Sequence, residues 1–557
     1  MTALAMDPQS IDYFRLSPML IVFGVAVVSV LVEAFAPAGR RYLIQLSLAA
    51  AGLVASMVAL GFVVRSYQVD GASDAMSGAV VIDGPSLFLQ GAVLVVSLGA
   101  VAVMGERRLD RVWAPLEVRT AAGARIAVTG SGQDAEGSVV DDADLPADAF
   151  TPSGATVPGS SDELIAGRAG TITTEVYPLA LLAIGGMMLF GACGDLLTMF
   201  IALEVLSLPL YLLCALARRR RLLSQEASLK YFLLGAFSSA VFLFGASFAY
   251  GATGSLDLGE IGAAVAGNHL GGSADRTLAL LALALIAVGL LFKVGAVPFG
   301  SWVPDVYQGA PSPVTALMAS ATKVAAFGAL LRVLHVAFPS LQSDWRPALW
   351  VAAIATMVIA TLMAVTQHDI KRMLAYSSVS HVGFALVGAI TISQAGVAAT
   401  LFYVAAYAVS AFGAFALLSV VRDQTGREAT DFDAWTGLGR RRPLVGAMMS
   451  LFLLAFAGIP LTSGFIAKFA VFSAAGDDGA WALVIVGVVC SAIAAYFYIR
   501  VIVAMFFAEP AADGPDVVTP SLLTSIPIAV SAAITLVLGI FPQWLLDIAD
   551  AASTFLR

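Results

Sequence analysis

The chain has 557 residues, of which 59 % are hydrophobic and 12 % are charged, and its mean hydropathy is +0.90. Soluble domains carry about 25 % charged residues, so this composition excludes a water-soluble globular protein. The formal net charge of −8 does not describe one surface, because much of it falls in a single polar segment. Cys193, Cys214 and Cys490 are isolated and lack CxxC spacing, which indicates small buried residues and excludes a disulfide framework or a metal site.

Apolar runs of about 20 residues recur along nearly the whole chain, as membrane-spanning helices require. They predict an all-α polytopic membrane protein with about fourteen spans, and an even number places both termini on the same side. The predicted spans are residues 17–36, 42–64, 85–105, 177–194, 195–217, 226–251, 278–299, 313–338, 347–366, 370–391, 394–421, 444–474, 481–508 and 521–546.

The basic residues predict the orientation of these spans. With the termini outside, the inside loops hold nineteen arginines and lysines, including Arg218 to Arg221 and Arg440 to Arg442, whereas the outside segments hold five. Basic residues accumulate in cytoplasmic loops, so we expect both termini outside.

Residues 106–176 form the polar segment, rich in Gly, Ser, Asp and Ala. Since they lack helical or strand periodicity and are acidic, we expect a flexible cytoplasmic loop. A tolerated surface insertion and a docking or regulatory segment both fit this composition.

Four of the five lysines lie inside apolar spans, namely Lys230, Lys293, Lys323 and Lys468, whereas most arginines lie in loops. Arginine keeps its proton under nearly all conditions, but a desolvated lysine releases one readily. A charge at the bilayer centre costs about 2.5–3.5 kcal/mol on insertion scales, so these lysines indicate a function. The alternative for Lys230 and Lys293 is that their side chains extend to the membrane interface.

Glu204 stands nine residues into its span, which places it about 13 Å deep. A carboxylate at that depth needs a partner, and Lys230, at the start of the next span, is the nearest candidate in sequence. Arg332 and Arg500 lie nearer the ends of their spans, which favours interfacial anchors.

Prolines accompany two of the lysines. Pro298 follows Lys293 by five residues, and Pro460 precedes Lys468 by eight. Proline interrupts a helix, and discontinuous membrane helices often line cavities that bind ions. An ordinary kink packed against neighbouring helices is the alternative.

His381 lies eleven residues into its span beside two serines. Imidazole titrates near neutral pH and could relay protons, although a hydrogen-bonded core histidine fits equally well. The sequence contains no Walker A motif, no GxGxxG after a strand and no cysteine cluster, so we expect this chain to bind no redox cofactor.

Several long stretches resemble the antiporter-like membrane subunits of respiratory complex I. They are KVGAVPFGSWVPDVYQGAPSPVTALMASATK, QHDIKRMLAYSSVSHVGFALVG and LAFAGIPLTSGFIAKF, while IALEVLSLPLYLL followed by EASLKYFLLGAFSSAVFLFGASFAYGATGSL resembles subunit N in particular. The resemblance implies fourteen helices with broken helices 7 and 12 and two inverted five-helix repeats. It divides the chain into N-terminal helices at 1–105, the loop at 106–176, repeats at 177–338 and 347–508, and a C-terminal helix at 521–557.

The resemblance also implies roles for single residues. Glu204 matches the glutamate of helix 5, and Lys230 matches the helix 6 lysine that pairs with it. Lys293 matches the lysine of the broken helix 7 and Lys323 the connecting lysine of helix 8. Lys468 matches the lysine of the broken helix 12, near the exit to the outside. His381 matches a helix 10 histidine.

One departure concerns the sequence PFGSW, where the family usually has PFHxW, so that Gly300 replaces a histidine. The implied function is a proton path in the membrane arm of a bacterial plasma-membrane complex, beside subunits M and K. NADH, FMN, iron–sulfur clusters and quinone are expected in partner subunits. The rival functions are a cation/proton antiporter subunit, a structural spacer of the membrane arm, and a membrane redox enzyme with its own haem or quinone site.

Overall fold

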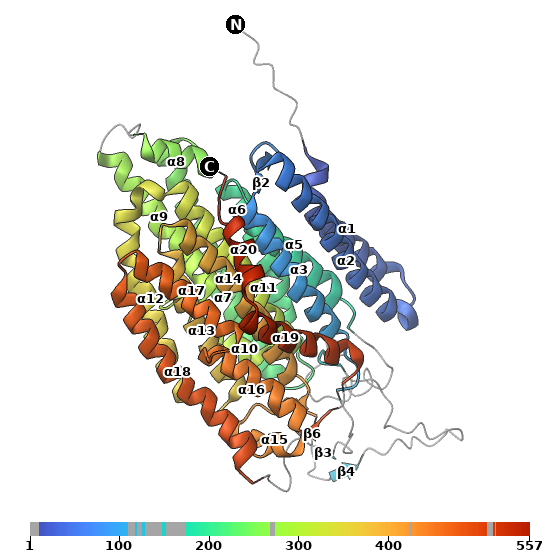
Figure 1. The fold of residues 1–557 in the computed structure, drawn as a ribbon. Helices are drawn as coiled ribbons and strands as arrows, with labels where there is room; N and C mark the ends of the chain where they lie inside the picture. Colours follow the sequence, from blue (N-terminus) through green and yellow to red (C-terminus); the bar gives the residue numbers. More distant parts are fainter. Residues whose placement is uncertain are drawn as a thin grey trace.

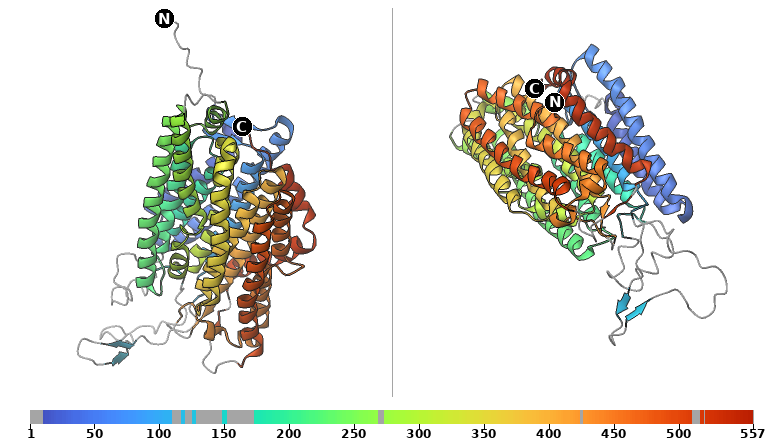
Figure 2. Two further views of the ribbon diagram at one scale, coloured as in Figure 1. Left: turned by 90° about the vertical axis from the view of Figure 1, so that its left-hand side faces the viewer. Right: turned by 60° about the horizontal axis from the view of Figure 1, so that its bottom comes forward.

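The structure is a computed structural model that describes residues 11–109, 117–119, 125–127, 148–151, 173–267, 273–423, 426–509, 516–518 and 520–556. The long helices lie roughly parallel to one another (Figures 1 and 2). The α-helices are α1 Tyr13–Phe35, α2 Ala38–Asp70, α3 Gly84–Met104, α5 Val176–Phe190, α6 Leu196–Cys214, α7 Arg221–Thr253, α8 Leu258–Ala266, α9 Ser273–Val294, α10 Trp302–Gly309, α11 Ser312–Arg332, α12 Gln342–Val365, α13 Ile370–Ala389, α14 Gln394–Leu418, α15 Leu438–Arg441, α16 Pro443–Ala457, α17 Ser463–Asp477, α18 Trp481–Phe507, α19 Leu522–Ile540 and α20 Gln543–Ala551.

The remaining elements are short. Three antiparallel strand pairs join β1 Ser73–Ala75 to β2 Val80–Ile82, β3 Glu117–Arg119 to β4 Arg125–Ala127, and β5 Val421–Arg422 to β6 Asp516–Val517. The chain between α11 and α12 forms a π-helical turn, Val333–Ala337, and a 3-10 turn, Pro339–Leu341; Phe432–Trp435 is a further 3-10 turn. The pair β3–β4 lies inside the segment predicted to be a flexible loop; most of that segment lies outside the described residues, and its character stays a prediction.

Every predicted span coincides with a helix, or with a pair of helices, in the described part of the chain. Within that part, eleven helices are long and apolar enough to cross a membrane, and α5 and α16 are shorter apolar helices. In Figure 1 the N- and C-termini lie at the end of the bundle that carries α8, which we call the α8 end; the opposite end, which carries α15 and β6, is the α15 end. The polytopic all-α fold is confirmed, whereas the number of fourteen spans stays a prediction.

Helices α11 and α14 form the centre of the bundle. Their most apolar windows are 100 % and 94 % buried by the rest of the chain, whereas those of α1, α2 and α18 are about one-third buried. The outer helices expose leucine, valine and phenylalanine, because in a bilayer their outer faces meet lipid. Polar side chains on α11, α13 and α14 are therefore shielded from the surroundings.

Two spans are interrupted. Helix α9 ends at Val294, Gly295 has a φ of +86°, and the chain becomes helical again only at Trp302 in α10. Helix α16 ends at Ala457, Gly458 has a φ of +81°, and α17 begins at Ser463. These are the predicted broken helices. Each break exposes backbone carbonyl groups that no longer have a partner inside their own helix.

Two pairs of aspartates relate the two predicted repeats. Asp195 caps the start of α6 and forms an isolated bridge with Asp257, whereas Asp369 caps the start of α13 and forms one with Asp431. Both pairs span the same number of residues in the sequence. The first pair lies at the α8 end, beside β2, and the second at the α15 end, beside Arg220. Equal spacing at opposite ends supports the prediction of inverted repeats.

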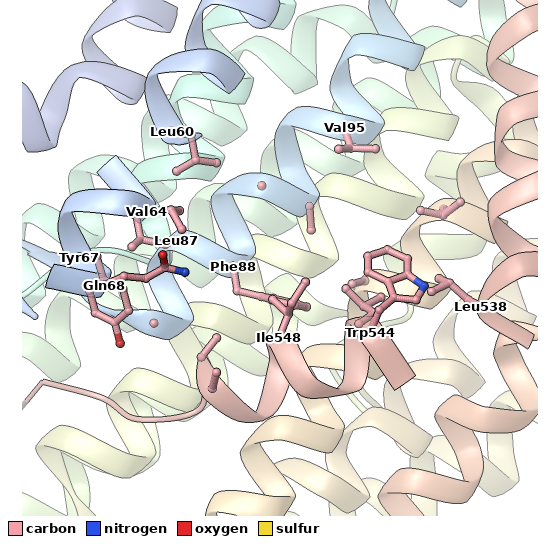
Figure 3. A pocket seen from close by; sticks show the side chains of 18 of the residues that line it. Leu60, Val64, Tyr67, Gln68, Leu87, Phe88, Val95, Leu538, Trp544 and Ile548 are labelled. Atoms are coloured by element: carbon pink, nitrogen blue, oxygen red, sulfur yellow. The ribbon is translucent and has the colours of Figure 1, made fainter. Parts of the chain in front are cut away.

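The C-terminal helices close one side of the bundle. Helix α20 runs back over α3, and Leu556 donates its backbone N–H to Asp83 at 3.1 Å. Between α2, α3, α14, α19 and α20 lies an apolar cavity of about 520 Å³, lined among others by Leu60, Phe88 and Trp544 (Figure 3). This cavity lies apart from the buried lysines.

Candidate functional site

Lys293 stands one residue before the break in α9 and is 4 % exposed. Its ammonium donates to the hydroxyl of Ser207 at 2.7 Å and to that of Tyr231 at 3.2 Å. Ser207 lies on α6 and Tyr231 on α7, so three helices meet at this lysine. Both partners are neutral oxygens, and the alternative that Lys293 extends to the membrane interface is wrong.

Lys230 does not pair with Glu204 in this structure, so the predicted ion pair is wrong here. The ammonium of Lys230 lies 2.8 Å from Glu226, one turn earlier in α7, and 2.9 Å from Asp305. The oxygen Oε1 of Glu204 is buried and has no hydrogen-bond partner. Lys230 has this partner because the chain turns at the break after α9, so that α10 packs against α7 and brings Asp305 to Lys230.

Asp305 is a functional candidate that the sequence reasoning did not single out. One of its carboxylate oxygens binds Lys230, and the other lies 2.8 Å from the guanidinium of Arg372 at the start of α13. Arg372 also donates to Gln308 at 2.9 Å. The signal was present in the stretch DVYQGAP, which sets a carboxylate directly after the broken helix.

Lys323 lies in the buried helix α11 and is 4 % exposed. Its ammonium donates to the carbonyl oxygen of Val294 at 3.2 Å and to that of Ser378 at 3.1 Å. Val294 is the last residue of α9 and follows Lys293 directly, so the break places Lys323 beside the first lysine. A helix carboxyl end carries partial negative charge, which stabilises a cation.

Gly300 lies where the backbone of the break folds back on itself. A Cβ atom at this position would lie 2.2 Å from the carbonyl oxygen of Gly295, too close for any side chain. The histidine that the family usually has here is therefore incompatible with this backbone.

Lys468 occupies the second break and is 5 % exposed. Its ammonium donates to the carbonyl oxygens of Phe456 at 2.8 Å and Ala457 at 3.1 Å, and to the hydroxyl of Ser491 at 2.8 Å. The ring of Phe384 lies 4.7 Å from the same ammonium. As at Lys323, the carboxyl end of an interrupted helix holds the lysine.

His381 lies on α13 between the two breaks. Its Nδ1 atom lies 2.7 Å from the hydroxyl of Tyr403, and its ring stacks on Tyr407 with centroids 4.8 Å apart. The other nitrogen, Nε2, is buried without a hydrogen-bond partner, and the histidine lines a small internal cavity together with Ser410 and Ser463. This nitrogen is therefore a buried polar atom that the surrounding side chains leave unsatisfied.

The buried groups lie close to one another along the bundle. Lys323 contacts the residue next to Lys293, and its other acceptor, Ser378, lies one helical turn from His381 on α13. The ring of His381 packs against Phe456 with centroids 5.5 Å apart, and the carbonyl oxygen of Phe456 binds Lys468. The series of Lys293, Lys323, His381 and Lys468 therefore extends from one break to the other.

Arg332 is not an interfacial anchor. Its side chain is 1 % exposed and forms an ion pair at 2.8 Å with Asp83, which is fully buried. Its Nε atom donates to the carbonyl oxygen of Gly191 at 3.1 Å. The sequence gave the position of Arg332 along its span but not its partner Asp83, which caps the start of α3.

A second buried ion pair closes the α15 end. Lys371 lies 2.8 Å from Glu428, in the segment after β5, and Arg422 lies near the same carboxylate. Burial favours the neutral form of Glu428, but the charges of Lys371 and Arg422 outweigh it and lower the pKa of Glu428 to about 2. This glutamate is therefore ionised at neutral pH and holds Lys371 as a cation.

The lysines thus fall into two sets. Lys230 and Lys371 are ion-paired, whereas Lys293, Lys323 and Lys468 bond only to hydroxyl and carbonyl oxygens and have no carboxylate within 4 Å among the described residues. A lysine bonded to neutral oxygens can release its proton without leaving a carboxylate unpaired. In the same part of the chain no group of three or more His, Cys, Asp or Glu residues is placed to hold a metal ion.

The interrupted helices and buried lysines define the class of antiporter-like membrane subunits, and comparison with known proteins agrees. Residues 193–494 match the family model described as the transmembrane region of NADH:quinone oxidoreductase and Mrp antiporters. Curated proteins named NADH-quinone oxidoreductase subunit N match over 98 % of this chain, at 57 % identity in Rhodococcus opacus and 55 % in Mycobacterium tuberculosis, covering 97 % and 99 % of those proteins. The chain belongs to the subunit N family of NADH-quinone oxidoreductase.

Solved structures share the fold. A chain of respiratory complex I from Thermus thermophilus with bound aureothin aligns with a TM-score of 0.70 at 30 % identity, covering 95 % of this chain and 98 % of that one. A chain of the Mrp complex from Dietzia aligns with a TM-score of 0.74 at 20 % identity, covering 96 % and 97 %. The alignment with the Mrp chain shows only that the two chains share a fold.

Proposed function

We propose that this chain provides a proton path through the membrane arm of an NADH-quinone oxidoreductase. The observation that carries the proposal is the series of Lys293, Lys323, His381 and Lys468, buried in an apolar bundle and bonded to neutral groups. Each of these side chains carries a nitrogen atom that can bind or release a proton. A structural spacer would have no use for three such lysines, since each is costly in a bilayer.

The path is driven from elsewhere in the complex. Oxidation of NADH and reduction of quinone take place on cofactors of partner subunits, and this chain supplies no redox centre of its own. Moving one charge against 100 mV costs about 2.3 kcal/mol, so the transfers need coupling to that reaction. The neighbours we expect in the membrane arm are subunit M and the small subunit K.

The orientation follows from the arginines. Arg218 to Arg221 and Arg440 to Arg442 lie at the α15 end, which we assign to the cytoplasm of a bacterial plasma membrane. Both termini then lie outside. Protons enter from the cytoplasm toward Lys293, pass Lys323 and His381, and leave by Lys468.

The test is replacement of Lys293 by methionine in the assembled complex, reconstituted into vesicles. We expect proton pumping to fall at least tenfold and quinone reduction to fall with it, while subunit composition stays unchanged. Arg276→Gln, which removes an exposed cation paired with Asp344 at 3.0 Å, is the matched control and should pump normally. Full coupled pumping by the Lys293→Met complex would instead support a structural spacer.

A cation/proton antiporter is the second candidate, because its members share this fold. Sodium transport by vesicles that contain this chain without redox partners would favour it. Pumping that depends on NADH and is insensitive to sodium favours the proton path of an oxidoreductase.

A further inference from the structure

The apolar cavity in Figure 3 lies between helices near the two ends of the chain. It has a volume of about 520 Å³, and its walls come from α2, α3, α14, α19 and α20. Among the described residues that line it, three side chains carry a polar group, namely Tyr67, Gln68 and Trp544. Small-molecule sites are clefts of about 300–1,000 Å³ with apolar walls and a few polar groups. The cavity has the size and the lining of such a site.

The cavity is long and runs inward from the α8 end. Figure 3 shows Gln68 at one end of it and Leu538 and Trp544 toward the other. Its wall on α3 extends from Gly84, the first residue of that helix, to Val95, which corresponds to about 16 Å of helix rise. The hydrocarbon core of a bilayer is about 30 Å thick, so each leaflet contributes about 15 Å. The cavity therefore has the depth of a single leaflet.

The width of the cavity indicates which apolar group can fill it. A volume of about 520 Å³ over a length of about 16 Å gives a mean cross-section of about 30 Å². An α-helix with its side chains is about 10 Å across, which is a cross-section of about 80 Å². A transmembrane helix of a neighbouring subunit is therefore too wide to enter fully, whereas one extended hydrocarbon chain is narrow enough.

Helix α20 turns its apolar face toward the cavity. Trp544, Leu545 and Ile548 line it, whereas Asp547 and Asp550 are exposed and lie outside the lining. Trp544 and Ile548 keep 50 % and 49 % of their surface exposed, so the described part of the chain does not cover this face. An amphipathic helix at the membrane boundary buries its apolar face against acyl chains.

Arg65 supplies a positive charge near the α8 end of the cavity. It lies on α2 one helical turn before Gln68, and both side chains are exposed. The guanidinium of Arg65 has no ion pair or hydrogen bond within the described part of the chain. Asp70, the next acidic residue along α2, pairs with Arg15 at 3.5 Å instead. Arginine binds phosphate groups through paired hydrogen bonds, and long cationic side chains near helix ends extend to the headgroup region.

We propose that this cavity binds one acyl chain of a phospholipid, whose phosphate is bound by Arg65 and Gln68 at the α8 end. The chain enters beside Tyr67, passes Phe88 and Ile548, and ends near Val95. The depth of one leaflet, the narrow cross-section and the unpaired cation at the headgroup level together select this ligand. The site is independent of the proposed proton path.

The test is photolabelling of the assembled complex by phosphatidylglycerol that carries a diazirine near the end of one acyl chain. We expect adducts in the peptides of α3 and α19 that contain Val95 and Leu538. Gly91→Leu fills the cavity and should lower these adducts at least fivefold; a Cβ atom at Gly91 meets only Leu60, at 3.6 Å, so the helix tolerates the change. Gly24→Leu adds the same side chain to α1, where no atom lies within 4 Å, and is the matched control.

A second variant tests the phosphate contact. Arg65→Gln changes an exposed side chain and should raise the lipid concentration for half-maximal labelling at least threefold, whereas Arg65→Lys should restore most of the affinity. A long-chain alcohol with the same diazirine has no phosphate, so it should label the unsubstituted complex and Arg65→Gln equally.

Three outcomes would overturn the assignment. If the unsubstituted complex gives no adducts in these peptides, or if Gly91→Leu gives as many, the acyl chain does not lie in the cavity. If an isoprenoid quinone analogue with the same diazirine labels these peptides and the phospholipid does not, the ligand is a quinone. If Arg65→Gln leaves half-maximal labelling by phosphatidylglycerol unchanged, Arg65 does not bind the phosphate.

Discussion

The ammonium of Lys468 lies 2.8 Å from the carbonyl oxygen of Phe456, and this bond joins the two parts of a broken helix. Phe456 belongs to the last turn of α16, whereas Lys468 belongs to α17. The last carbonyl groups of a helix have no partner within it and carry partial negative charge. The break thus supplies acceptors that hold the lysine without an opposing full charge.

Removing the hydroxyl acceptor that α18 supplies to Lys468 should slow proton transfer without abolishing it. Ser491→Ala deletes one of three hydrogen bonds to Lys468, a change worth about 0.5–1.5 kcal/mol, or two- to tenfold in rate. The measurement is the initial rate of acidification of vesicles that contain the assembled complex. Ser450→Ala is the control, because Ser450 bonds only within α16 to Gly446. Equal effects of both variants would contradict the role of Ser491.

Tyr403→Phe should impair the relay at His381. The change removes the hydroxyl that bonds Nδ1, leaving both ring nitrogens without a partner and the tautomer undefined. We expect pumping to fall several-fold while NADH oxidation by the peripheral subunits stays normal. Tyr42→Phe loses a comparable hydroxyl bond, to the carbonyl oxygen of Gly105, far from the route, and should pump normally. If Tyr403→Phe pumps at the normal rate, His381 is not a proton relay but a hydrogen-bonded histidine of the core.

Arg332→Met should lower the stability of the folded chain and leave proton pumping unchanged. Removing one partner of a buried ion pair leaves the other charge unpaired, at a cost of about 3–5 kcal/mol. We expect a lower melting temperature of the purified complex and poorer assembly, with an unchanged number of protons pumped per electron in complexes that do assemble. The double variant Arg332→Met with Asp83→Leu should regain part of the melting temperature, because it leaves no unpaired charge. A lower number of protons per electron would place Arg332 on the path instead.

Acid should strengthen the docking of residues 148–151 onto the α15 end. Burial raises the pKa of Asp148 to about 6, although the charge of Arg218, 3.6 Å away, opposes it. With the unfolded pKa near 3.8, the docked state binds more protons between pH 4 and 6, so docking weakens as pH rises through this window.

The measurement is hydrogen exchange at the amide of Thr151, which donates to the carbonyl oxygen of Leu216 at 2.9 Å. Protection should be greater at pH 5 than at pH 7 after correction for intrinsic exchange. Asp148→Asn should show equal protection at both values, and a pH dependence that survives this change would assign it to another group.

The apolar runs alone predicted the spans and the burial of Lys293, Lys323 and Lys468. Backbone groups in a bilayer must be satisfied within a helix, so hydropathy predicts the spans directly. A lysine inside such a run is visible without a structure, which is why Lys293, Lys323 and Lys468 were found. The proline of each break, Pro298 and Pro460, was equally visible.

Tertiary structure decided the partners. Lys230 was assigned to Glu204 because the two are close in sequence, but the break after α9 brings Asp305 to it. Arg332 was assigned to the membrane surface by its place near a span end, but it is buried and pairs with Asp83 at the start of α3. Hydropathy measures depth along one helix and carries no information on which neighbouring helix a side chain faces. The contact between Lys323 and Val294, which joins the first lysine to the rest of the route, exists only in the folded chain.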